Sequence, residues 1–137
     1  MSTTAVERSW CVVVPHHAYG ARLARNRLAA ELGPIVPRAL LADAVAVLAE
    51  LVGNAIRHAD PLPGEVVRVA WRLRPRGQKP AVMVCVTDGG SPRHRPVLRM
   101  VGPEAVDGRG LRIVVALAER WGVDRDGLGQ SVWAELA

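Results

Sequence analysis

Two segments of the chain repeat their apolar residues at the three- and four-residue spacing of an amphipathic helix. Residues 17–32 carry apolar side chains at mixed helical spacings and end at Gly33-Pro34, a pair that stops helices. Residues 37–59 begin at a proline, which suits the first turn of a helix. The expected core face of this second helix consists of Leu41, Val45, Leu48, Val52 and Ile56.

Shorter segments show the patterns of β-strands. Residues 65–74 alternate between apolar and polar side chains, as in a sheet that is covered on one face. Residues 81–87 form a near-continuous apolar run, which is typical of a central strand. A turn at residues 75–80 joins these two strands, so we expect an antiparallel hairpin. Residues 10–14 and 130–136 predict two further strands.

The remaining part of the chain divides into a loop and a helix. Residues 89–107 are rich in Gly, Pro and Arg and have no sustained period, and a loop of this length is usually a lid or a binding loop. Residues 108–121 read as a third helix that Gly122 closes. The order predicts an α/β fold, a two-layer sandwich in which a mixed, mostly antiparallel sheet carries three helices on one face. Without a repeat or linker, residues 1–137 read as a single domain.

Composition narrows the class of protein. The net charge of +5 suggests an acidic partner, but the basic residues are scattered and only 4% of residues are aromatic, which argues against direct nucleic-acid binding. No apolar run approaches the ~20 residues that span a bilayer, and the N-terminus does not resemble a secretory signal. We therefore expect a cytoplasmic protein without a membrane partner. Cys11 and Cys85 are expected to be reduced thiols rather than a disulfide or metal site.

Polar residues on the second predicted helix are the first candidates for chemistry. Glu50 and Asn54 are four residues apart, so they lie on one face of the helix. From this helix alone, the alternative is a solvated polar face. Asn54 and the neighbouring Gly53 both weaken a helix, Gly53 by up to ~1 kcal/mol relative to alanine. Their position beside a carboxylate indicates a site where a ligand approaches the backbone.

Two glycine-containing clusters follow. Asp88 comes directly after a predicted strand and precedes Gly89 and Gly90, which allow a ligand to approach, although a plain Asp-Gly turn is common. The sequence GRGL at residues 108–111 opens the third helix, where free backbone N–H groups attract phosphate. Alone, this cluster is a weak signal, because it matches neither GxGxxG nor a P-loop.

The order of the three clusters resembles the GHKL ATPase family, which includes histidine-kinase catalytic domains and the anti-sigma factor serine kinases. ELVGNAIRHA resembles the N box of that family, DGG its first glycine box and GRGLRIV its second. The resemblance extends from about residue 10 to the end of the chain. The small size and the closing SVWAEL strand are most similar to the anti-sigma factor serine/threonine kinase branch. The resemblance implies the Bergerat-type ATP-binding fold.

The resemblance also implies roles for individual residues, with ATP and Mg²⁺ as the cofactors. Asn54 would coordinate Mg²⁺ between the phosphates, and Glu50 would act as general base toward the nucleophile. Asp88 would accept a hydrogen bond from the adenine amino group, with Gly90 providing clearance beneath the purine. The second glycine box would form the hinge of the lid that faces the phosphates, and it would open the third helix. Its residues are Gly108, Arg109, Gly110 and Leu111.

Further roles are less closely defined by the resemblance. Ser131 lies where a threonine that holds adenine through water is common. Arg57 and His58 follow the N box. They would either contact phosphate or cap the end of the helix. The ATP lid would span residues 89–108, which are short and rich in proline compared with family kinases. Gly53 stands where many relatives carry a larger or hydroxyl side chain.

We therefore expect an ATP-binding anti-sigma factor that acts as a Mg-ATP-dependent serine/threonine protein kinase. Its partners would be a sigma factor and an anti-anti-sigma antagonist, whose serine it phosphorylates, and a homodimer is left open. The alternative, suggested by the short lid, is a module of the same fold that sequesters a regulator without chemistry. A detached histidine-kinase domain is less favoured, because no segment of the chain supplies the histidine-bearing dimerisation helix.

Overall fold

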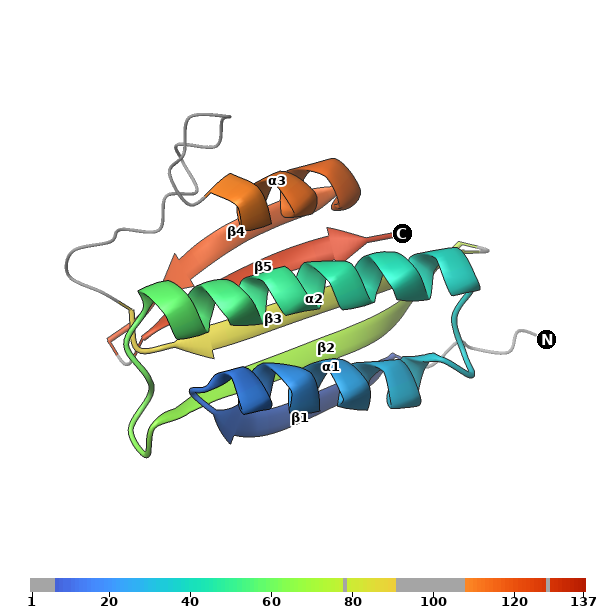
Figure 1. Ribbon diagram of the computed structural model, residues 1–137. Coiled ribbons are helices and arrows are strands. Elements are labelled where there is room, and N and C mark those ends of the chain that lie inside the picture. The colour runs from blue at the N-terminus through green and yellow to red at the C-terminus, as the bar shows by residue number, and fades with distance from the viewer. Residues whose placement is uncertain (1–6, 78, 91–107, 128) are drawn as a thin grey trace.

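The computed structural model describes residues 7–77, 79–90, 108–127 and 129–137, of which the side chains of Arg76 and of residues 108–111 are not described. Three helices lie on one face of a five-stranded sheet (Figure 1). The elements are β1 (Arg8–Pro15), α1 (Ala18–Leu32), α2 (Arg38–His58), β2 (Val66–Arg76), β3 (Lys79–Asp88), α3 (Gly108–Leu117), β4 (Arg120–Arg125) and β5 (Gln130–Leu136). This arrangement confirms the predicted two-layer α/β sandwich.

The sheet has the strand order β1-β2-β3-β5-β4, and each pairing among the described strands is antiparallel. The predicted hairpin is present as β2 and β3. Its turn is shorter than predicted, because Pro75 pairs with Pro80 and Arg76 pairs with Lys79 within the ladder. Gly77, which the sequence already places in this turn, has a φ of 60°, a left-handed conformation that glycine adopts readily.

Helix α2 is the central helix of the layer and packs between α1 and α3 over the sheet. Its length and apolar composition would suffice to cross a membrane, but its apolar side chains form the core of the sandwich. The predicted core face was only partly correct, because Leu41, Val45 and Ile56 are half-buried at its margin. A central helix contacts neighbours on two sides, so its buried surface is wider than one stripe: Leu40, Ala44, Val47, Leu48, Leu51, Val52 and Ala55.

The prediction for residues 108–121 was wrong at its C-terminal end. Helix α3 ends at Leu117, and the chain enters strand β4 at Arg120. Gly122 does not cap a helix but lies in this strand against Trp133, and a Cβ at Gly122 would be 2.8 Å from an indole carbon. A short edge strand with half-buried Trp121 and Val123 shows too few alternating positions to be distinguished from a last helical turn.

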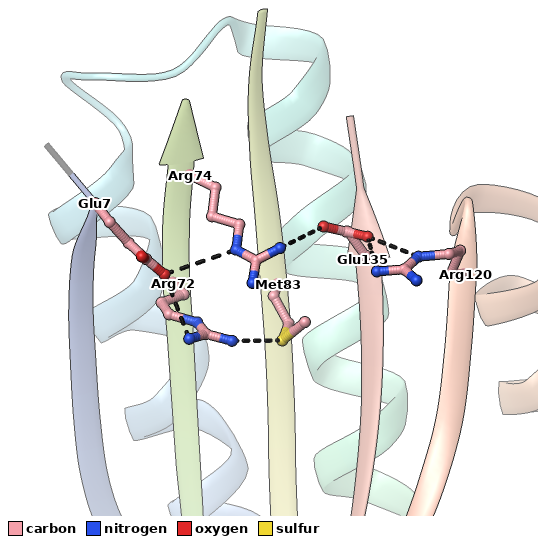
Figure 2. Close-up of polar contacts among 6 residues, drawn as sticks. All are labelled: Glu7, Arg72, Arg74, Met83, Arg120 and Glu135. Atoms are coloured by element: carbon pink, nitrogen blue, oxygen red, sulfur yellow. Dashed lines mark hydrogen bonds and ion pairs between the residues drawn. The ribbon is translucent and has the colours of Figure 1, made fainter. Parts of the chain in front are cut away.

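The face of the sheet opposite the helices carries a network of ion pairs (Figure 2). Glu135 is only 4% exposed and accepts two hydrogen bonds from Arg120, at 2.9 and 2.7 Å. Arg74 lies 3.5 Å from the other carboxylate oxygen of Glu135 and also pairs with Glu7, which in turn contacts Arg72. The network crosses the sheet from β1 to β4, and it neutralises a carboxylate that is otherwise costly to bury.

Candidate functional site

The predicted N box and first glycine box meet at one corner of the molecule, just beyond the C-terminal ends of α2 and β3. Asp60 donates its backbone N–H to the Gly90 carbonyl at 2.9 Å, and the Gly89 N–H donates to the Asp60 carbonyl at 2.7 Å. A Cβ at Gly89 would lie 2.4 Å from the Pro61 carbonyl oxygen, and Gly90 has a φ of 74°. Both glycines are therefore required by the backbone contact that joins the two motifs.

Asp88 is the last residue of β3 and is buried, with 3% of its surface exposed. Burial raises the pKa of its carboxyl group to about 6, against the lowering effects of the Gly90 N–H and of the charge on His16. The Gly90 N–H donates to Oδ1 at 2.7 Å, and no described residue donates to Oδ2. Asp88 therefore holds an acceptor oxygen that a ligand with an N–H group can use.

Gln130 and Ser131 lie next to each other on β5 but belong to opposite faces of the sheet. Gln130 pairs with Asp88 across the β3–β5 ladder, on the side that the helices cover. The Ser131 hydroxyl is hydrogen-bonded to the Thr87 hydroxyl at 2.7 Å, on the side without helices. The structure thus brings Gln130, and not Ser131, to the side of Asp88. Strand alternation could have indicated this, because buried Ala134 and Leu136 share the parity of Gln130.

Glu50 and Asn54 occupy successive turns of α2, and both are half-buried. Arg57 donates from Nη2 to Oδ1 of Asn54 at 3.0 Å. A Cβ at Gly53 would be 2.8 Å from Nη1 of Arg57, so the glycine leaves room for the guanidinium group. The carboxylate of Glu50 has no hydrogen-bond or ion-pair partner within the described part of the chain. Its oxygens are therefore open to contact with a ligand.

His16, which no motif points to, closes the C-terminal end of α2. Its Nε2 lies 3.0 Å from the Ala55 carbonyl oxygen and 2.9 Å from that of Ala59, so this nitrogen carries a proton that it donates. Its backbone N–H donates to the Glu65 carbonyl at 3.0 Å. Since the last carbonyls of a helix have no partner within the helix, His16 fixes the end of α2 against the turn between β1 and α1. His58, the last residue of α2, is half-buried at the same end.

The second glycine box is described only by its backbone. Gly108, Arg109, Gly110 and Leu111 form the first turn of α3, and α3 begins at the end of the molecule where α2 ends (Figure 1). The first turn of α3 and the corner formed by α2 and β3 therefore lie at the same end of the molecule. The side chains of Arg109 and Leu111, and residues 91–107 of the predicted lid, lie outside the described residues.

The protein oxygen atoms at this corner suit a magnesium ion whose other ligands come from water and from bound phosphate groups. Among the described residues, no three His, Cys, Asp or Glu side chains gather into a metal site of their own. Mg²⁺ prefers oxygen donors, keeps several waters, and is commonly bound through one or two protein oxygens together with substrate phosphates. The amide oxygen of Asn54 fits that role, although a metal would have to displace Arg57 from it.

Comparisons with known proteins agree with this geometry. A family model described as the histidine kinase-like ATPase domain matches residues 14–136. The structure is similar to the crystal structure of the RsbU and RsbW domains of Rv1364c from Mycobacterium tuberculosis, with a TM-score of 0.66 and 20% identity over 94% of this chain and 31% of that chain. The chain thus spans about a third of that structure, and the likeness shows the fold. No curated protein matches the sequence at a significant level. Because the family model covers nearly the whole chain, the protein belongs to the histidine kinase-like ATPase domain family.

Proposed function

We propose that the protein is an anti-sigma factor that binds Mg-ATP and phosphorylates a serine of an anti-anti-sigma antagonist. The observation that supports this most is the corner at which the N box and the first glycine box meet. It combines a buried carboxylate that has a free acceptor oxygen with an amide and a carboxylate on successive turns of α2. Helix α3 begins at the same end of the molecule. An ATP-dependent protein kinase needs these three functions, namely recognition of the base, binding of the metal and phosphates, and activation of the hydroxyl.

Asp88 would recognise the adenine base. Its carboxylate is fixed at Oδ1 by the Gly90 N–H, so Oδ2 has a defined direction before the ligand arrives. A carboxylate accepts hydrogen bonds only, which matches the exocyclic amino group of adenine and opposes the carbonyl at the same position of guanine. The absence of a side chain at Gly90 leaves space beside the carboxylate for a planar ring.

Glu50 and Asn54 would serve the phosphoryl transfer. Mg²⁺, when bound, neutralises charge on the phosphate oxygens. The Asn54 amide oxygen, one turn from Glu50 on α2, would hold that metal. Glu50 orients the substrate serine and accepts its proton while the serine oxygen bonds to the γ-phosphorus. The bond from that phosphorus to the β–γ bridging oxygen breaks, and ADP leaves with the electron pair.

The partner proteins would dock on α1 and the loop that follows it. Tyr19 and Leu23 on α1, and Ile35 beyond it, are large apolar side chains that are exposed in this structure. Exposed apolar side chains on one element are typical of a surface that binds another protein. The net charge of +5 suits a partner with an acidic face, since opposite charges accelerate the encounter.

A variant at Glu50 separates kinase activity from binding. Glu50→Gln should bind Mg-ATP with nearly native affinity, because the carboxylate acts on the hydroxyl rather than on the nucleotide. Its rate of phosphate transfer from γ-labelled ATP to the serine of an antagonist should fall at least 100-fold, which is typical for loss of a general base. Equal transfer rates for the native protein and Glu50→Gln would contradict the assigned role of Glu50. Binding of ATP without transfer to any antagonist would favour the sequestering module.

A further inference from the structure

We propose that His16 is a positioning residue that holds the base-binding half of the nucleotide site at a fixed distance from its metal-binding half. The inference rests on the proposed binding of Mg-ATP, with the base at Asp88 and the metal at Asn54. It assigns a role to a side chain that none of the three sequence motifs contains.

The imidazole of His16 joins the last turn of α2 to the residue that follows the helix. Ala59 is the C-cap of α2 and has an extended backbone, with a φ of −122° and a ψ of 160°. Nε2 of His16 lies 2.9 Å from the carbonyl oxygen of Ala59 and 3.0 Å from that of Ala55. One N–H group is therefore shared by a carbonyl inside the helix and a carbonyl beyond its end. This contact fixes the direction in which the chain leaves α2.

The two carbonyls that share the imidazole belong to different halves of the site. Ala55 directly follows Asn54 on α2. Ala59 directly precedes Asp60, whose backbone N–H and carbonyl both pair with the first glycine box. That box begins with Asp88 at the end of β3. The orientation of the Ala59 peptide therefore sets where the carboxylate that would bind the base lies relative to the amide that would bind the metal.

The imidazole is itself held by the sheet. His16 directly follows Pro15, the last residue of β1, which pairs with Val66 of β2. Its backbone N–H donates to the carbonyl of Glu65 at 3.0 Å. Glu65 has a φ of 61°, and a strained conformation of this kind persists only where the surrounding contacts hold it. The edge of the sheet thus provides a rigid base from which His16 fixes the end of α2.

This arrangement predicts an effect on ligands that reach both halves of the site. A ligand that contacts one half alone binds equally well whatever the distance to the other half. ATP contacts both halves at once, so its affinity depends on their spacing, and a site whose spacing is already set binds it more tightly. His16 therefore contributes to the affinity for ATP through the backbone of α2.

The test compares the native protein with His16→Phe, which keeps a planar ring but has no donor. The ligands are Mg-ATP, adenosine and Mg-tripolyphosphate, each measured by displacement of a fluorescent ATP analogue. The proposal predicts about fivefold weaker binding of Mg-ATP, as expected for one hydrogen bond, and unchanged affinity for adenosine and Mg-tripolyphosphate. Equal weakening of all three ligands would show a general structural role and overturn the proposal, as would unchanged binding of Mg-ATP.

Two further variants make the comparison specific to the shared N–H group. His16→Gln keeps an N–H donor at a similar distance from the backbone, so its affinity for Mg-ATP should be native. A loss in His16→Gln as large as in His16→Phe would contradict the assigned hydrogen bond. His17→Asn changes the neighbouring residue, whose Nδ1 caps α1 by accepting the Tyr19 N–H. Because asparagine also caps helices, all three affinities should remain native in this control.

Amide hydrogen exchange tests the position of the chain without a ligand. In His16→Phe the N–H groups of Asp60 and Gly89 should exchange about fivefold faster, while those of Val69 and Val84 inside the sheet keep native rates. Unchanged rates at Asp60 and Gly89, or equal acceleration at all four residues, would overturn the role of His16. Native protein that binds none of the three ligands would refute the proposed function, whereas failure of the exchange result alone would refute only the role of His16.

Discussion

Arg57 donates a hydrogen bond to Oδ1 of Asn54 across one turn of α2, at 3.0 Å. That oxygen is the atom proposed to bind Mg²⁺, so a metal ion and the guanidinium group compete for it. Gly53 provides the space for the guanidinium, because a Cβ at this position would lie 2.8 Å from Nη1 of Arg57.

Replacement of Arg57 should make ATP binding more dependent on magnesium. In Arg57→Met the metal no longer displaces a cation from Asn54, and metal-free ATP loses a positive charge near its phosphates. Both effects raise the ratio of the Kd for ATP in EDTA to the Kd in Mg²⁺, and we expect an increase of at least threefold. Calorimetric titrations under both conditions measure the ratio. Arg22→Met, which removes an exposed arginine of α1, is the control and should leave the ratio unchanged. An unchanged or smaller ratio in Arg57→Met would refute the competition.

The raised pKa of Asp88 predicts opposite effects of pH on stability and on ATP binding. The folded protein holds this proton more tightly than the unfolded chain, because the carboxyl pKa is about 6 rather than 3.8. The free energy of unfolding should therefore gain a contribution from this group as pH falls from above 6 to about 4. ATP binding requires the ionised acceptor and should weaken over the same range.

The variant Asp88→Asn isolates this titration. The charge of the asparagine does not change with pH, whereas the titration of ATP itself affects both proteins equally. We expect the ratio of Kd values, variant over native, to be largest above pH 7 and to fall toward pH 5. The measurement is a series of ATP titrations at constant ionic strength. A ratio that stays constant between pH 5 and 8 would show that Asp88 does not accept a hydrogen bond from the nucleotide.

The ion-pair network on the open face of the sheet should contribute to stability and not to nucleotide binding. Glu135→Ala leaves Arg120 and Arg74 without their buried carboxylate partner, and we expect a loss of about 1–3 kcal/mol in the free energy of unfolding. Glu7→Ala removes an exposed partner of Arg74 and should change stability by less than about 1 kcal/mol. Urea titrations of both variants measure the two losses in the free energy of unfolding. If the loss in Glu135→Ala is no larger than the loss in Glu7→Ala, the buried carboxylate does not contribute more to stability than the exposed one, and the prediction is wrong.

Local patterns in the sequence predicted the elements that have strong periodicity. Helices α1 and α2, the β2–β3 hairpin and β5 are present near their predicted positions, because each has enough apolar repeats to define a face. Strand β4 was missed because its stability comes from the ladder with β5, including the contact of Gly122 with Trp133, which is a tertiary effect. The buried surface of α2 depends on its two neighbouring helices in the same way.

The candidate site likewise contains residues that the sequence indicated and residues that it did not. The motifs indicated Glu50, Asn54 and Asp88 as candidates, because the order of the three clusters resembles that of a known family, although each cluster alone is common. They did not locate His16, whose partners Ala55 and Ala59 are about 40 residues distant and are backbone carbonyls of any residue type. Nor could they show that Arg57 occupies the oxygen of Asn54, since this depends on side-chain conformation.

The central claim is that Asn54 holds Mg-ATP at the corner between α2 and β3. Calorimetric titration of the native protein and of Asn54→Ala with ATP, each with and without Mg²⁺, tests it most directly. The account predicts binding by the native protein that is strengthened by Mg²⁺, and loss of that strengthening in Asn54→Ala with an unchanged melting temperature. Absence of binding by the native protein up to millimolar ATP, or an equal effect of Mg²⁺ on both proteins, would contradict it.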